Sequence, residues 1–109
     1  MSPSKPDYVA IHRQAIAAAR QAVAAIAHEE GTRGMDCGFA WVAFPGNEPY
    51  GRAVRTQPEV SKGYPSGLQV WDPGRHAGQS IHIKEAGARA YSEVLKDNNI
   101  NSTVGSRYD

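Results

Sequence analysis

The chain has 109 residues and a formal net charge of +1 at pH 7, with 40% hydrophobic and 21% charged side chains. This length predicts one domain whose core is large enough to fold without disulfides or a structural metal. The balanced charge gives no global electrostatic reason to bind nucleic acid, membranes or acidic partners. The single cysteine, Cys37, excludes an intramolecular disulfide.

The first residues, Met-Ser-Pro-Ser-Lys-Pro, lack the apolar segment of a signal peptide. No apolar run approaches the ~20 residues that a membrane-spanning helix needs. These observations predict a cytoplasmic protein that does not act at a membrane. Residues 1–6 are predicted to be a disordered tail, and residues 7–109 a single α+β domain.

The segment from Asp7 to about Glu30 is predicted to be a helix, because apolar residues recur there every three or four positions. His12 takes one position of this core-facing stripe. The apolar members of the stripe are Val9, Ile16, Ala19, Val23 and Ile26.

A second stripe on the same helix consists almost entirely of small side chains, which let another backbone approach closely. Its members are Ile11, Ala15, Ala18, Ala22 and Ala25. Two interpretations are open. Either the helix lies on a sheet with this side half exposed, or the alanine face packs on a second copy of the chain and forms a homodimer.

The segment from Cys37 to Phe44 is predicted to be a strand that ends at Pro45. Because nearly all its residues are apolar, we expect it to be a central strand with both faces covered. Residues 46–61 are predicted to be a loop with one short helical turn near residues 52–56. Residues 68–71 form a second, short strand between two segments rich in proline and glycine.

Residues 79–83 fit either a third strand or the lead into a second helix, which periodicity places at residues 84–97. Asn98 and Asn99 followed by Ile100 match a left-handed helix cap with an apolar contact. Residues 100–108 are predicted to be the last strand. The predicted fold is α+β, a small and mostly antiparallel sheet with two helices packed on one face, in the order α-β-β-β-α-β.

The segment 62–76 has the mixed composition typical of a binding loop, with aromatic, cationic, acidic and glycine residues around a short apolar strand. Aromatic side chains interleaved with cations, including Arg52 and Arg55, are what a binder of single-stranded nucleic acid uses. Acidic residues such as Glu59 lie among them and weigh against that interpretation. The expected contact residues are Lys62, Tyr64, Trp71, Asp72, Arg75, His76 and Gln79.

Signs of catalysis and of metal binding are weak. Cys37 opens an apolar strand with no helix after it, so we expect a buried structural cysteine and not a nucleophile. The spacing of His76 and His82 matches no metal-ligand motif, and no glycine pattern matches a phosphate-binding loop. Ser80 is interpreted either as an ordinary helix cap or as part of an anion site between Arg75 and Lys84. No catalytic residue, metal or cofactor is predicted.

Three segments carry a resemblance: Gly-Met-Asp-Cys-Gly-Phe-Ala-Trp-Val from residue 34, Gly-Leu-Gln-Val-Trp-Asp-Pro-Gly from residue 67 and Lys-Glu-Ala-Gly-Ala-Arg-Ala from residue 84. With these segments the chain resembles small bacteriophage or prophage proteins of unassigned function. The resemblance implies a protein that binds a host protein, a nucleotide or nucleic acid in the host cytoplasm, often as a homodimer. Antagonists of host defence belong to this group.

The first hypothesis is therefore a non-enzymatic binding protein of phage type, acting through the segment 62–76 on a host protein or a nucleotide or nucleic-acid ligand. The alternative is a small enzyme acting on a phosphate-bearing substrate, with His76 as acid–base and Arg75 as anion clamp. A third interpretation is an assembly protein that buries the same aromatic residues in a symmetric interface.

Overall fold

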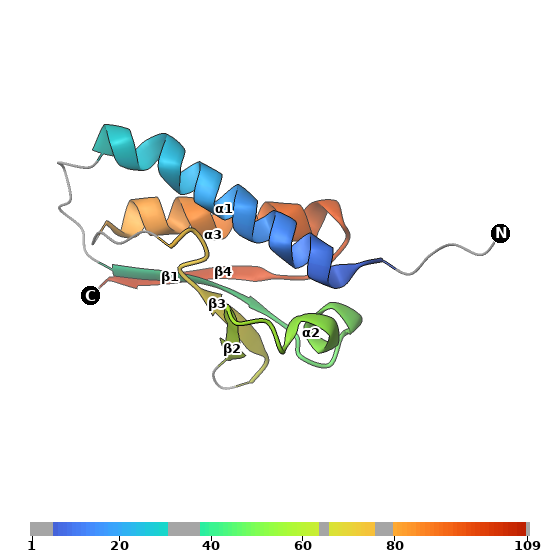
Figure 1. Ribbon diagram of the computed structural model, residues 1–109. Helices are drawn as coiled ribbons and strands as arrows, with labels where there is room; N and C mark the ends of the chain where they lie inside the picture. Colours follow the sequence, from blue (N-terminus) through green and yellow to red (C-terminus); the bar gives the residue numbers. More distant parts are fainter. Residues whose placement is uncertain (1–5, 31–37, 64–65, 76–79, 109) are drawn as a thin grey trace.

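The computed structural model describes residues 6–30, 38–63, 66–75 and 80–108, with residues 27–30 described by their backbone alone (Figure 1). One antiparallel sheet has the strand order β2 (Val60–Lys62), β3 (Leu68–Trp71), β1 (Gly38–Phe44), β4 (Thr103–Tyr108). The α+β class and the predicted order α-β-β-β-α-β of the strands and the two long helices are confirmed, with β2 in the place of the strand considered at residues 79–83. The elements are α1 (Tyr8–Glu30), β1 (Gly38–Phe44), α2 (Pro49–Val54), β2 (Val60–Lys62), β3 (Leu68–Trp71), α3 (Ile81–Asp97) and β4 (Thr103–Tyr108).

Helix α1 begins after Asp7, whose carboxylate accepts a hydrogen bond from the backbone N–H of Ala10 at 3.0 Å. The predicted core stripe is confirmed at His12, Ile16 and Val23, which are buried, whereas Val9 at the start of the helix is 36% exposed. Within the chain, α1 packs along α3. Of the small-residue stripe, Ala15 is fully buried in the core of the chain itself. A homodimer through the alanine face stays a prediction.

Helix α3 begins directly after Ser80, whose hydroxyl accepts from the backbone N–H of Ile83 at 3.5 Å. Residues 81–83 are therefore the first turn of the helix and not a strand, which decides between the two alternatives, and Ser80 acts as an ordinary cap. The predicted left-handed cap is confirmed: Asn99 has φ 59°, and the N–H of Ile100 donates to the carbonyl of Leu95 at 2.9 Å.

The segment 46–61 contains more regular structure than the sequence predicts. Its helical turn, α2, begins at Pro49 and not near residue 52, since proline suits the first position of a helix. The strand β2 was not predicted, because three residues are too few to show an alternating pattern.

Strand β1 lies at the centre of the sheet, between β3 and β4. Its side chains alternate between the two faces, so that Ala40, Val42 and Phe44 are buried while Phe39 and Trp41 are half-buried. Both long helices lie on one face of the sheet (Figure 1). The expectation that both faces of this strand are covered is therefore wrong, because no described helix lies on the face of Phe39 and Trp41.

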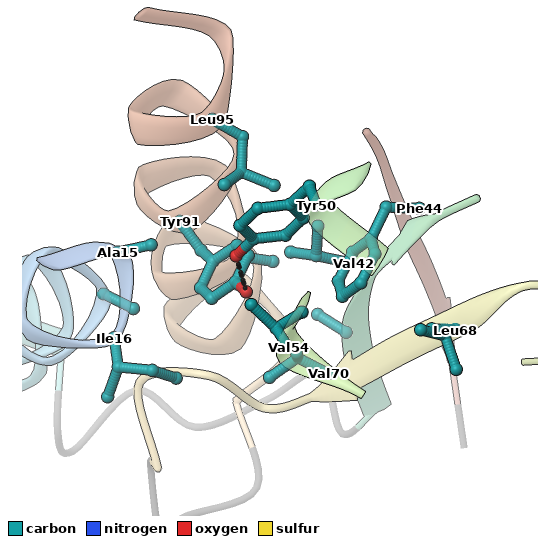
Figure 2. Packing of buried hydrophobic residues seen from close by; sticks show 13 residues of the cluster. Ala15, Ile16, Val42, Phe44, Tyr50, Val54, Leu68, Val70, Tyr91 and Leu95 are labelled. Carbon is teal, nitrogen blue, oxygen red and sulfur yellow. Dashed lines mark hydrogen bonds between the residues drawn. The ribbon is translucent and has the colours of Figure 1, made fainter. Parts of the chain in front are cut away.

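The hydrophobic core fills the space between the sheet and the helices (Figure 2). Val42 and Val70 come from neighbouring strands in register, and Tyr91 from α3 lies against them, fully buried. Helix α2 closes one end of the core with Tyr50 and Val54. Two tyrosine hydroxyls, those of Tyr50 and Tyr91, meet inside this apolar cluster (Figure 2).

Candidate functional site

Three aromatic side chains cluster on the sheet face opposite the helices: Phe39, Trp41 and Trp71, here called the aromatic face. The ring centroids of Trp41 and Trp71 lie 5.0 Å apart with the planes tilted by 36°. Phe39 meets Trp71 edge to face at 5.9 Å. Trp71 is 40% exposed, and the other two are half-buried. Exposed aromatic clusters of this kind offer ring faces on which a planar ligand stacks.

The indole ring of Trp41 lies over the backbone of Gly105, its register partner on β4. A Cβ atom at position 105 would overlap three atoms of that indole ring. Because glycine has no side chain, the ring lies across the neighbouring strand instead of projecting from the sheet. The aromatic face is thus a platform that spans β3, β1 and β4.

Arg107, the register partner of Phe39, is a cation on this face, whereas Lys84 comes from α3 and is buried. The guanidinium carbon of Arg107 lies 5.6 Å from the centroid of the Phe39 ring, and the amine of Lys84 lies 5.3 Å from the same centroid. Lys84 also donates to the carbonyl of Gly38 at 3.1 Å. No acidic residue occupies a described strand position on this face; the positions other than the three aromatics are Ala43, Ser61, Gln69, Thr103, Gly105 and Arg107.

Two cavities continue from this face toward α2. The nearer one, of about 500 Å³, is lined by Ala43 and Thr103, which are register partners on the open face, and by Ser66 and Gly67. The farther one, of about 670 Å³, shares Ser66 and Gly67 and adds two arginines, Arg52 and Arg55.

A different polar cluster lies inside the core, centred on His12. Its Nδ1 atom lies 2.7 Å from the hydroxyl of Tyr91, which lies 2.7 Å from the hydroxyl of Tyr50. Its Nε2 atom lies 2.9 Å from Oε1 of Glu59. Arg13 holds both oxygens of the same carboxylate, at 2.8 Å and 2.6 Å. The cluster joins α1, α2, α3 and the residue before β2.

Burial lowers the pKa of His12 and outweighs the hydrogen bond and charge of Glu59, which raise it. Partial burial alone would raise the pKa of Glu59, but hydrogen bonds from Arg13 and His12 lower it to about 2. Because an ionised carboxylate only accepts, Nε2 of the neutral imidazole carries the proton and Nδ1 accepts from Tyr91. The hydroxyl of Tyr91 in turn accepts a hydrogen bond from the hydroxyl of Tyr50, so every group in this hydrogen-bonded series has a partner.

Burial also raises the pKa values of both tyrosines, that of Tyr50 to about 12, although its hydrogen bond with Tyr91 opposes the shift. For Tyr91, burial is joined by repulsion from Tyr50 and by the hydrogen bond between them, and the pKa is raised further. Both phenols are therefore neutral hydrogen-bonding groups at neutral pH. The geometry is that of a satisfied polar network within the core.

The structure brings together only some of the residues predicted to bind a ligand. Asp72 and Arg75 line a cavity of about 210 Å³ together with Trp71 and Glu59. Lys62 is exposed and pairs with Leu68, at the other end of β3 from Trp71. The predicted contacts Tyr64, His76 and Gln79, and also Cys37, lie outside the described residues.

Sequence analysis missed the two aromatic partners of Trp71. Phe39 and Trp41 were assigned to a covered central strand, because an all-apolar strand predicts burial on both faces. One signal was present: Phe39 and Trp41 fall on the same side of the alternation, whereas the other side carries Ala40, Val42 and Phe44. No sequence pattern indicated that Arg107, on the edge strand β4, would lie on this face.

Within the part of the chain that the structure describes, no group of three or more histidine, cysteine or acidic side chains is placed to hold a metal ion. No described helix is long and apolar enough to cross a membrane.

Comparison with protein families, with curated proteins and with solved structures found no significant match.

Proposed function

We propose that this protein binds single-stranded nucleic acid by stacking bases on the aromatic face. The observation that carries the proposal is the platform of Trp41 and Trp71 on the face opposite the helices, with the Trp41 ring laid across the backbone of Gly105. Unpaired bases of any sequence present ring faces to such a platform, and each stacked base contributes about 1–3 kcal/mol.

The charge pattern supports nucleic acid over a second copy of the chain as the occupant. Arg107 is the charged side chain among the described strand positions of this face. A symmetric sheet-to-sheet contact would set this cation against a face whose described strand positions carry no carboxylate to pair with it. A polyanion with planar bases matches both the cation and the rings.

The role of the segment 62–76 is narrower in this proposal than the sequence predicts. Trp71 keeps its predicted contact role, while Lys62 and Arg75 lie toward opposite ends of β3. A phage origin, a host protein as partner and antagonism of host defence stay predictions, and binding of nucleic acid is compatible with each of them.

The alternative of an enzyme depends on His76, which lies outside the described residues. Arg75 shares a cavity with the carboxylate of Glu59. Three hydrogen bonds from Arg13 and His12 hold that carboxylate and lower its pKa to about 2, so it is a poor general base. The contacts of Glu59 therefore favour binding over catalysis.

The proposal is tested by titrating the protein with a single-stranded oligothymidylate and following tryptophan fluorescence, which stacking quenches. Trp71→Ala is expected to raise Kd about five- to 150-fold, the equivalent of one lost stacking contact. Tyr108→Ala is the matched control: Tyr108 is 67% exposed but lies on the opposite side of the strand alternation of β4. Its Kd is expected to stay within about twofold of the wild type.

A duplex of the same length is expected to bind much more weakly, because its bases are already stacked and paired. Equal binding of duplex and single strand would contradict the proposal. So would a stable dimer that loses its self-association on Trp71→Ala, since a second copy would then occupy the aromatic face.

A further inference from the structure

The cavity of about 670 Å³ beside α2, here called the arginine cavity, has the composition of an anion site. Among the described residues, two guanidinium groups line it, together with hydrogen-bonding side chains and loop backbone, and no acidic residue does. Its lining includes Arg52, Arg55, Asn47, Ser66, Gly46 and Gly67. Planar guanidinium groups match the oxygens of a phosphate in pairs, and amide and hydroxyl groups add single hydrogen bonds.

Both arginines are exposed, and neither forms an ion pair with a carboxylate among the described residues. The nearest acids in the sequence are Glu48 and Glu59. The carboxylate of Glu48 accepts from the side chain of Asn101 at 3.5 Å, and that of Glu59 accepts from Arg13. Nη2 of Arg55 lies 3.5 Å from the point that a Cβ on Gly46 would occupy. The guanidinium group therefore lies against the loop backbone with its remaining donors available.

The arginine cavity is continuous with the open face of the sheet. It shares Ser66 and Gly67 with the cavity of about 500 Å³ that Ala43 lines. Ala43 follows Trp41 by two positions on β1 and so lies on the same face, about 7 Å further along the strand. A ligand that stacks on Trp41 and continues along β1 reaches the two arginines.

We infer that the arginine cavity is a phosphate-binding site that holds a backbone phosphate of the strand stacked on the aromatic face. The assignment of that phosphate to nucleic acid rests on the proposed function. The affinity of the cavity for a phosphate group does not depend on that function, because it comes from the two arginines. Each phosphate contact of a single strand contributes about 0.7 to the slope of log K against log salt concentration.

The test compares the double variant R52Q/R55Q with the control R20Q/R89Q, which removes the same charge from exposed positions on α1 and α3. Oligothymidylate binding is measured from 50 to 300 mM NaCl. Separately, pyrophosphate is titrated into the wild type and both variants while the amide resonances of Gly46 and Gly67 are followed. R52Q/R55Q is expected to lower the salt slope by about 0.7, the value for one phosphate, and to abolish the pyrophosphate shifts. The control R20Q/R89Q is expected to keep the salt slope and the pyrophosphate shifts of the wild type.

The possible failures can be told apart. An unchanged salt slope, with tryptophan quenching intact, would overturn the arginine cavity as a subsite and leave the proposed function standing. Pyrophosphate shifts that persist in R52Q/R55Q would overturn the cavity as an anion site. Pyrophosphate binding that depends on the arginines, without oligothymidylate binding, would support the anion site for a small phosphate-bearing ligand and reject the proposed function.

Discussion

The hydroxyl of Tyr91 lies 2.7 Å from Nδ1 of His12, a contact that joins residues 79 positions apart in the sequence. Both side chains are fully buried, so neither can exchange this bond for water. The bond is the middle of a chain that runs from Tyr50 through Tyr91 and His12 to Glu59. The stability of the fold therefore depends on a polar network that crosses its apolar core.

Removing the middle hydroxyl is expected to cost more stability than removing the terminal one. Tyr91→Phe leaves both Nδ1 of His12 and the hydroxyl of Tyr50 without a partner, so we expect a loss of about 2–4 kcal/mol. Tyr50→Phe removes one donor and leaves the bond between Tyr91 and His12 intact, with an expected loss of about 0.5–1.5 kcal/mol. Urea unfolding of both variants measures the difference. Equal losses would contradict the direction of the hydrogen-bond chain.

Stability is expected to fall in two steps as the pH is lowered. In the folded state the pKa of His12 lies below its ordinary value of 6.5, so the unfolded chain takes up a proton first and gains in population as the pH drops below about 6.5. The pKa of Glu59 is about 2 in the folded state against 4.5 ordinarily, so its contribution is lost between pH 4.5 and about 2.

The two steps are separated by comparing unfolding free energies at several pH values in matched variants. His12→Gln is expected to lose the upper step. His82→Gln removes a histidine whose side chain is 55% exposed and is expected to keep both steps. If the upper step survives in His12→Gln, another group causes it.

Gly105→Ala is expected to disturb the aromatic face without removing any aromatic side chain. The new methyl group would overlap the indole ring of Trp41 and lift it from β4. We expect weaker quenching of tryptophan fluorescence by oligothymidylate and an altered near-ultraviolet circular dichroism signal from the Trp41–Trp71 pair. Unchanged affinity in a folded Gly105→Ala variant would show that the flat arrangement of Trp41 is not needed.

Gly74→Ala tests the close approach of the turn after β3 to helix α1. A Cβ at this position would overlap the side chain of Val23 and lie 2.9 Å from the carbonyl oxygen of Ala19. Overpacking of this kind costs about 1–3 kcal/mol, measured as a lower midpoint of urea unfolding. Gly46→Ala is the control, since the atoms nearest to its Cβ would lie at ordinary contact distance, 3.5 Å.

The sequence predicted the elements that carry a strong local pattern. The three-to-four spacing placed α1, with His12 in its core stripe, and the Asn98–Ile100 signal placed the end of α3. Prediction from the sequence failed where a segment is short, as for β2. It also failed where one residue type has two explanations, as for the aromatic residues of β1, because an apolar strand looks alike whether a helix or a ligand covers it.

By itself, the sequence determined the α+β class, the order of the elements and the burial of one histidine, because periodicity and capping act over a few residues. Only the tertiary structure decided which side chains meet. The antiparallel register sets Trp41 between Trp71 and Gly105, and the packing of α1 on α3 sets His12 against Tyr91. These contacts join distant parts of the chain, and register and packing, unlike periodicity, are fixed only when the whole fold forms.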